Sequence, residues 1–302
     1  MTKRKKHKIV ILAGGGLFGY VATYLLSHIK EDFVTKIDTI SGTSIGGILA
    51  LIYAVCPDRK YINDQFKLGG EQIFARSFLD KLKLSGPKYS NKNLLKFIKV
   101  FLQDYTLADL YQVNQRHLNV IIPTIDYNLS QPKIFDNICE LDLDMPLWQL
   151  ALATSAAPTY FPAIQYKDTV LIDGGVLENI PITSTITALM SRCDIRMEDM
   201  DIFVIGTGID VEEKKLTAEQ VTNFNYINWL FDFLIPYVTE SNEMASMYWW
   251  QQKGIHVNSI RVFNPVKISG AMDDPAVLNY VESWCEPYIE QFKSEFMEFL
   301  NK

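Results

Sequence analysis

Short apolar runs alternate with amphipathic stretches along this chain. Four runs are mostly apolar, which is typical of strands buried on both faces: Lys8–Ala13, Asn119–Ile125, Val170–Ile172 and Asp201–Ile205. Shorter strands are predicted at Lys133–Phe135 and Ser259–Phe263. Helices are predicted at Tyr20–Ile29, Ile45–Val55, Pro146–Ala156, Pro181–Arg192 and, as one long amphipathic helix, Pro275–Leu300. The alternation predicts an α/β fold in which helices flank a mostly parallel central sheet with right-handed crossovers.

No internal repeat, low-complexity tract or linker divides the chain, so we expect a single domain over residues 8–302 behind a basic tail at residues 1–7. The glycine-rich motifs fall within about residues 8–210, and residues 211–302 are predicted to be rich in helices. Residues 58–110 are rich in Lys, Asn, Gln and aromatic residues and are predicted to form a helical insertion. This insertion is either a cap over a functional site or a peripheral helical layer.

The segment Tyr226–Trp250 combines apolar residues at helical spacing with clustered aromatic residues, and Pro236 is expected to kink it. One interpretation is a helix hairpin packed on the core or in a homodimer. The other is an amphipathic element that enters the membrane interface, where Trp and Tyr are favoured.

Charge changes the range of partners that we expect. The formal net charge is −6 and the sequence pI is near 5.3, which argues against a nucleic-acid binder because a phosphate backbone demands a basic face. The basic cluster Lys3–Lys8 lies at the N-terminus. It is either a solvated tail or a segment attracted weakly to an anionic membrane surface.

The four cysteines are scattered along the chain without the spacing of a zinc site or a disulfide framework, so we expect a cytoplasmic protein without a metal site. The start of the chain has no apolar run long enough for a signal peptide. The charge-free run Thr39–Pro57 approaches transmembrane length, but its first half is rich in Ser, Thr and Gly, so we predict a buried helix there.

A serine between two glycines stands where an apolar strand meets an apolar helix. The sequence Gly42-Thr43-Ser44-Ile45-Gly46 matches the G-x-S-x-G nucleophile elbow, in which small neighbours allow the serine to point outward from a sharp turn. The N–H of Ile45 and the N-terminus of the following helix would face the oxygen that the serine attacks. Ser44 is therefore the candidate nucleophile, and a plain tight turn is the alternative.

The first predicted strand leads into the loop Gly14-Gly15-Gly16-Leu17-Phe18-Gly19 and then a helix. Backbone N–H groups in such a loop can hold a negative oxygen. The spacing fits either a dinucleotide fold or an oxyanion hole for acyl transfer. A dinucleotide site also needs an acidic residue at the end of the second strand, where this chain carries the serine turn instead.

A third motif, Asp173-Gly174-Gly175, follows another apolar strand. Open α/β sheets place catalytic groups at the carboxyl ends of their strands, and flanking glycines let another backbone approach. Asp173 is therefore a candidate catalytic group, although a lone Asp-Gly-Gly is more often a turn.

Together these stretches resemble the patatin-like phospholipases, serine acyl hydrolases that act on membrane lipids. The resemblance rests on the Gly14–Gly19 loop, the Gly42–Gly46 elbow, the stretch Ala153–Pro162 and Asp173–Gly175, with Gly206–Gly208 as a further strand-end turn. It covers roughly residues 8–210, with the motifs in the order of the family.

The resemblance implies a patatin-like three-layer α/β fold and a Ser–Asp dyad that needs neither metal nor cofactor. Ser44 would attack the ester carbonyl and Asp173 would take its proton. The oxyanion hole would be formed by backbone N–H groups of Gly14, Gly15, Gly16 and Ile45. The supporting glycines of the motifs are Gly19, Gly42, Gly46, Gly174 and Gly175.

The implied substrates are membrane phospholipids or lysophospholipids, reached by peripheral association with the membrane. The family also allows a membrane-degrading effector that is gated by an activating ligand or by a partner, and the sequence leaves a homo-oligomer open. Many members carry Arg or Lys just before the last glycine of the first loop, where this chain has Phe18. Because of this departure, a neutral-lipid (triacylglycerol-type) lipase stays an alternative. A second alternative is a catalytically silent protein that binds lipid or a partner.

Histidine distinguishes the dyad from an ordinary Ser-His-Asp triad. The α/β-hydrolase order places His after Asp, and His256 is the histidine that follows Asp173. We expect His256 to be a surface or packing residue, because Ser44 lies too early in the chain for that fold.

Overall fold

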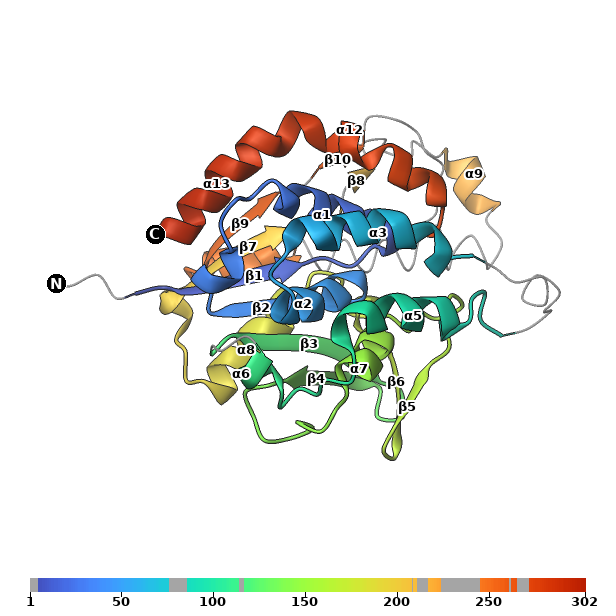
Figure 1. Ribbon diagram of the computed structural model, residues 1–302, viewed down its shortest axis with the longest axis horizontal. Helices are drawn as coiled ribbons and strands as arrows, with labels where there is room; N and C mark the ends of the chain where they lie inside the picture. The colour runs from blue at the N-terminus through green and yellow to red at the C-terminus, as the bar shows by residue number, and fades with distance from the viewer. Residues whose placement is uncertain are drawn as a thin grey trace.

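One large sheet with helices on both faces forms the centre of the fold (Figure 1). The structure is a computed structural model and describes residues 5–75, 86–113, 117–207, 209–210, 217–223, 245–260, 262–264 and 272–302. The described strands of the large sheet are β1 (His7–Leu12), β2 (Thr39–Gly42), β3 (Asn119–Asp126), β4 (Gln131–Asp136), β5 (Ile164–Tyr166), β6 (Thr169–Asp173), β7 (Met200–Ile205) and β9 (His256–Ile260). They follow the order β5-β6-β3-β2-β1-β7-β9, with β4 paired to β3. A small parallel pair joins β8 (Ile209–Asp210) to β10 (Phe263–Asn264).

The sheet is parallel at its centre and antiparallel at one end. Strands β3, β2, β1, β7 and β9 run parallel to one another, which confirms the predicted α/β sheet. Strands β4 and β6 run antiparallel to β3, and β5 runs antiparallel to β6. Only short turns join β3 to β4 and β5 to β6, whereas a parallel connection needs a crossover of a dozen residues or more.

Strand β3 carries partners on both edges, and this arrangement positions the candidate site. Along one edge β4 pairs with residues 121–126 of β3. The other edge is shared, because β2 pairs with residues 119–121 and β6 with residues 124–126. Since β2 is parallel to β3 and β6 antiparallel, the carboxyl ends of β2 and β6 point toward each other.

Helices cover the two faces of the sheet unequally. Strand β1 shows the alternation: Val10 and Leu12 belong to one buried cluster, and Ile9 and Ile11 to the other. The larger cluster packs beneath α1 (Gly19–Ser27), α2 (Ile45–Val55), α3 (Arg59–Ile73), α5 (Asn91–Leu102), α6 (Leu110–Val113), α7 (Leu147–Thr154), α12 (Val281–Cys285) and α13 (Ile289–Asn301). The smaller cluster packs beneath α8 (Ile182–Arg192) and the helical residues 245–252. The fold therefore has the three layers that the resemblance implied.

Short 3₁₀ helices connect several of these elements. They are η1 (Gly16–Phe18), η2 (Phe33–Lys36), η3 (Gly174–Val176), η4 (Met197–Asp199), η6 (Pro275–Asn279) and η7 (Glu286–Tyr288). The remaining described helix is α9 (Ala218–Thr222). Within the described residues, no helix is both long and apolar enough to cross a membrane.

The single long helix predicted at Pro275–Leu300 is wrong. The chain there forms η6, α12, η7 and α13 in turn. Pro287 lies in the first turn of η7, where its missing N–H and its ring interrupt a continuous α-helix. The last predicted strand, Ser259–Phe263, is displaced as well, because β9 already ends at Ile260.

Two other predicted segments lie partly outside the described residues. Most of Tyr226–Trp250 lies outside them, so only the helix at residues 245–252 bears on that segment. In the predicted insertion at residues 58–110, α3 packs on α1, and α5 packs on α2 and α7. These helices are therefore part of the main helical layer.

Candidate active site

Ser44 occupies a strained turn between β2 and α2. Its φ of 55° and ψ of −127° lie outside the ordinary regions for a residue with a side chain. A Cβ on Gly42 would lie 2.3 Å from the Gly46 carbonyl, and one on Gly46 would lie 2.1 Å from the Leu12 carbonyl oxygen. No larger residue fits at either position. The hydroxyl of Thr154, at the end of α7, supports the turn by accepting a hydrogen bond from the Ser44 N–H at 3.2 Å.

Asp173 meets Ser44 because β2 and β6 end opposite each other along β3. It is the last residue of β6 and pairs with Thr124. The Ser44 hydroxyl lies close enough to its carboxylate to lower the pKa of that carboxylate, and the Gly175 N–H donates to Oδ1 at 2.7 Å. The structure thus brings the two predicted catalytic residues together, through a predicted strand whose antiparallel direction the sequence pattern did not indicate.

Burial sets the proton affinity of this carboxylate. Asp173 is only 3% exposed, and the loss of solvation raises its pKa from 3.8 to about 7, although the Gly175 N–H and the nearby Ser44 hydroxyl act in the opposite direction. A carboxylate with a pKa near 7 can accept a proton and return it at neutral pH.

The first glycine loop is held at both ends by residues from distant parts of the chain. The Gly14 N–H donates to the Asn179 carbonyl at 3.0 Å, and the Thr207 hydroxyl donates to the Gly14 carbonyl at 2.6 Å. At the other end the Leu17 N–H donates to the Met272 carbonyl at 2.8 Å. The loop is therefore fixed before Gly15 and after Gly16.

The N–H groups between these anchors are available to a ligand. Gly15 and Gly16 both have positive φ, 145° and 58°, and no described residue accepts a hydrogen bond from either N–H. The Ile45 N–H, in the first turn of α2, likewise has no described acceptor, as expected at a helix N-terminus. Gly14 differs from the prediction, because its N–H is already bonded. Of the four predicted oxyanion donors, three have their N–H groups unoccupied.

The supporting glycines lie where neighbouring groups approach closely. A Cβ on Gly19 would lie 2.5 Å from the Ile45 side chain, and one on Gly174 would lie 2.6 Å from the Pro123 carbonyl oxygen. A Cβ on Gly175 would lie 3.0 Å from Asp173 Oδ1, the atom to which the Gly175 N–H donates. These close approaches favour residues without side chains at these positions.

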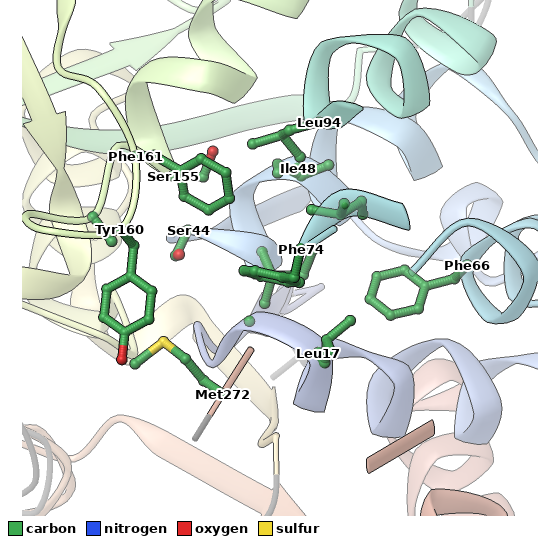
Figure 2. A pocket seen from close by; sticks show the side chains of 14 residues that line it. Leu17, Ser44, Ile48, Phe66, Phe74, Leu94, Ser155, Tyr160, Phe161 and Met272 are labelled. Carbon is green, nitrogen blue, oxygen red and sulfur yellow. The ribbon is translucent and has the colours of Figure 1, made fainter. Parts of the chain in front are cut away.

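An apolar pocket opens beside the serine (Figure 2). Its walls come from the glycine loop, from helices α2, α3 and α5, from the turn after α7 and from the segment before η6. Figure 2 shows Tyr160 and Phe161 beside Ser44, with Phe66 on the far side of the pocket. The lining residues are Gly16, Leu17, Ser44, Ile45, Ile48, Phe66, Ile73, Phe74, Leu94, Ser155, Ala157, Tyr160, Phe161 and Met272. A nucleophile, a buried carboxylate and free N–H groups beside an apolar pocket can perform acyl transfer on an ester with an apolar chain.

Sequence reasoning missed four residues of this site. Thr154 and Thr207 act on it through their hydroxyls, and Asn179 and Met272 through their backbone carbonyls. Thr154 and Thr207 lie in stretches that carry the family resemblance, but the motifs give neither residue a role. No pattern in the sequence could show that the carbonyls of Asn179 and Met272 reach the glycine loop.

Neither His256 nor Phe18 lines the pocket beside Ser44. The first residue of β9, His256, hydrogen-bonds through Nδ1 to Asp201 at 2.7 Å, near the start of β7. The glycine loop follows the opposite end of the parallel strand β1, so His256 takes no part in the site, as expected. The Phe18 ring stacks on Trp284 at 6.4 Å and does not line the pocket. Among the described residues, no group of three or more His, Cys, Asp or Glu side chains could hold a metal ion.

The chain is similar in sequence to patatin-like proteins and to phospholipases. The chain is 28% identical to Patatin-like protein 1 of Arabidopsis thaliana over 272 residues, which cover 74% of this chain and 64% of that protein. It is 33% identical to the cGAMP-activated phospholipase of Vibrio cholerae serotype O1 over 202 residues, 58% of this chain and 55% of the relative. The chain thus spans less than two thirds of the length of these relatives.

Among solved structures, VipD from Legionella pneumophila is similar over 95% of this chain and 67% of its own, with 11% identity and a TM-score of 0.43. The sequence profile described as patatin-like phospholipase matches residues 10–186, which include the elbow, the glycine loop and Asp173. The chain belongs to the patatin-like phospholipase family.

Proposed function

We propose that the protein is a lipid acyl hydrolase that cleaves carboxylic esters of membrane phospholipids or lysophospholipids. The observation that carries this proposal is the placement of the Ser44 hydroxyl beside the buried Asp173 carboxylate, at one end of an apolar pocket and next to free N–H groups of the glycine loop. Its family membership supports the same reaction.

In the proposed mechanism, the acyl chain lies in the apolar pocket with the ester carbonyl above Ser44. Asp173 accepts the hydroxyl proton as the serine oxygen attacks the carbonyl carbon. The negative oxygen of the tetrahedral intermediate is held by the N–H groups of Gly15, Gly16 and Ile45. When the intermediate collapses, protonated Asp173 gives its proton to the leaving alcohol. Water then hydrolyses the acyl-serine, with Asp173 again as the base.

Peripheral contact with a membrane is part of the proposal. Val176 and Leu177 follow the Asp173 motif directly and are 41% and 43% exposed, and Met272 on the pocket wall is 40% exposed. Exposed apolar side chains next to the site would favour a lipid surface. The N-terminal basic residues would add attraction to anionic lipids.

The test is the release of fatty acid from phospholipid, lysophospholipid and triacylglycerol vesicles by the wild type and by the variants Ser44→Ala, Asp173→Asn and His256→Ala. We expect both dyad variants to lose at least about 10³-fold in activity, because nucleophile and base act as one unit, and His256→Ala to match the wild type. Hydrolysis that survives Ser44→Ala would contradict the proposal. Preference for triacylglycerol would favour the neutral-lipid lipase instead.

A fluorophosphonate probe, which labels an activated serine, separates two explanations of an inactive wild type. Labelling at Ser44 without hydrolysis would favour a gated enzyme. Since the Vibrio relative is named a cGAMP-activated phospholipase, cGAMP is the first ligand to add in that case. No labelling would favour the catalytically silent lipid-binding protein.

A further inference from the structure

A short segment far along the chain lies directly on the glycine loop. Besides accepting the Leu17 N–H, the Met272 carbonyl oxygen would lie 2.4 Å from a Cβ built on Gly16. Met272 therefore fixes the end of the loop that carries the unoccupied Gly15 and Gly16 N–H groups. It lies beyond residues 10–186, the part of the chain that matches the family profile.

The next residue anchors this segment through a buried charge. The side chain of Asp273 is 3% exposed, and its Oδ2 accepts hydrogen bonds from the Lys88 ammonium and the Tyr89 hydroxyl. A buried carboxylate that accepts from one charged donor and one hydroxyl is held in a defined position. Removal of either donor leaves the buried carboxylate without full compensation.

The two donors are themselves fixed to the wall of the pocket. The Lys88 and Tyr89 N–H groups donate to the carbonyls of Thr159 and Tyr160 at 2.7 and 2.8 Å. The Lys88 ammonium also lies 5.6 Å from the centre of the Tyr160 ring, which lines the pocket. Asp273 thus joins the pocket wall to the segment that holds the glycine loop.

We propose that Asp273 is a positioning residue for the oxyanion hole: its contacts with Lys88 and Tyr89 hold the Met272 carbonyl in place. That carbonyl anchors the loop through the Leu17 N–H and so fixes the direction of the free Gly15 and Gly16 N–H groups. Two consecutive glycines with positive φ have little stiffness of their own, so an external anchor has a large effect on their orientation. Misplacement of catalytic groups by about 1 Å can cost about 10²-fold in rate. The inference rests on the proposed acyl hydrolase function.

The test compares Asp273→Asn with Asp274→Asn, which makes the same change one residue later. Asp274 caps η6 by accepting the Ala276 N–H at 2.9 Å and has no part in the pocket. With a soluble short-chain ester, we expect Asp273→Asn to lower kcat by about 10-fold or more, while KM changes by less than about twofold. Affinity for an alkyl boronic acid, which forms a tetrahedral adduct on the serine, should fall in parallel, and Asp274→Asn should match the wild type.

Variants of Lys88 keep the inference testable if Asp273→Asn does not fold. Lys88→Arg retains the charge pair and should keep kcat, whereas Lys88→Met should lower it as Asp273→Asn does, with circular dichroism confirming that each variant is folded. An unchanged kcat in folded Asp273→Asn or Lys88→Met, or an equal loss in Asp274→Asn, would overturn the positioning role and leave the proposed function standing. A wild type that neither hydrolyses esters nor labels at Ser44 would overturn both.

Discussion

At the scale of single residues, the raised pKa of Asp173 links the proposed chemistry to pH. The base must be deprotonated to accept the Ser44 proton, so kcat/KM should rise with pH and level off above about 7. A pH profile measured with a soluble ester checks this, and His256→Ala is the matched control because its removal should leave the midpoint unchanged. A midpoint near 4 would contradict a buried general base.

The same group should make stability depend on pH. The folded-state pKa lies above the ordinary value of 3.8, so the folded state retains a proton that the unfolded chain releases between about pH 4 and pH 7. The wild type therefore loses stability over that range, on the order of 1.4 kcal/mol for each pKa unit, relative to a variant with no charge at this position. The free energy of unfolding of Asp173→Asn, measured with urea, should therefore increase relative to that of the wild type as the pH rises from about 4 to 7. Parallel stability curves for the two proteins would contradict the shift.

The site residues that could be predicted from the sequence are those with a distinctive local pattern. Ser44 needs small neighbours on either side, and Asp173 needs glycines after it, so short motifs carry both signals. Met272 and Asp273 contribute through contacts with residues more than 180 positions earlier, and neither has a distinctive neighbourhood. Their roles depend on tertiary structure, which a motif cannot encode.

At the scale of elements, the periodic patterns located the central strands and most helices, but not the direction of β6. The sequence indicated that a strand ends at Asp173, and strand direction depends on the connection and on partners elsewhere in the sheet. In the C-terminal region the pattern predicted helix correctly but did not show where the helix is interrupted. Its apolar spacing is helical throughout, but Pro287 divides it into shorter pieces.

Helices α3 and α5 determine the far end of the pocket, and we expect them to set the preferred acyl-chain length. The fully buried Phe66 ring lines the pocket across from Ser44 (Figure 2), stacks on Tyr20 at 6.0 Å and meets Phe97 edge-on at 5.9 Å. Phe66→Ala should open space beyond the pocket and raise the relative kcat/KM for longer acyl chains, measured with esters of increasing chain length.

Phe97→Ala is the matched control for this prediction. It removes the neighbouring ring, with a similar cost to packing, but Phe97 does not line the pocket. Its chain-length profile should follow that of the wild type. The same shift in both variants would indicate general loosening of the helical layer and contradict a specific role for Phe66.

At the scale of the whole molecule, residues beyond the family profile complete the fold. The profile ends at residue 186, yet β7 lies between β1 and β9, and α13 covers the same face of the sheet as the helices around the site (Figure 1). The Phe296 ring of α13 is fully buried and lies 5.0 Å from that of Phe203 on β7 and 5.6 Å from that of Phe33. The stability of the motif-bearing part therefore depends on the C-terminal helix.

This dependence predicts a variant that loses stability without losing chemistry. Phe296→Ala should lower the free energy of unfolding by about 3–5 kcal/mol, because it removes a fully buried ring from a packed aromatic cluster. In contrast, Ser294→Ala on the exposed face of the same helix should change it by less than about 0.5 kcal/mol. Urea unfolding gives both values, and kcat is measured well below the unfolding midpoint. Since α13 contributes no residue to the pocket, kcat of folded Phe296→Ala should equal that of the wild type, and a reduced kcat would mean that the C-terminal helix also orders the active site.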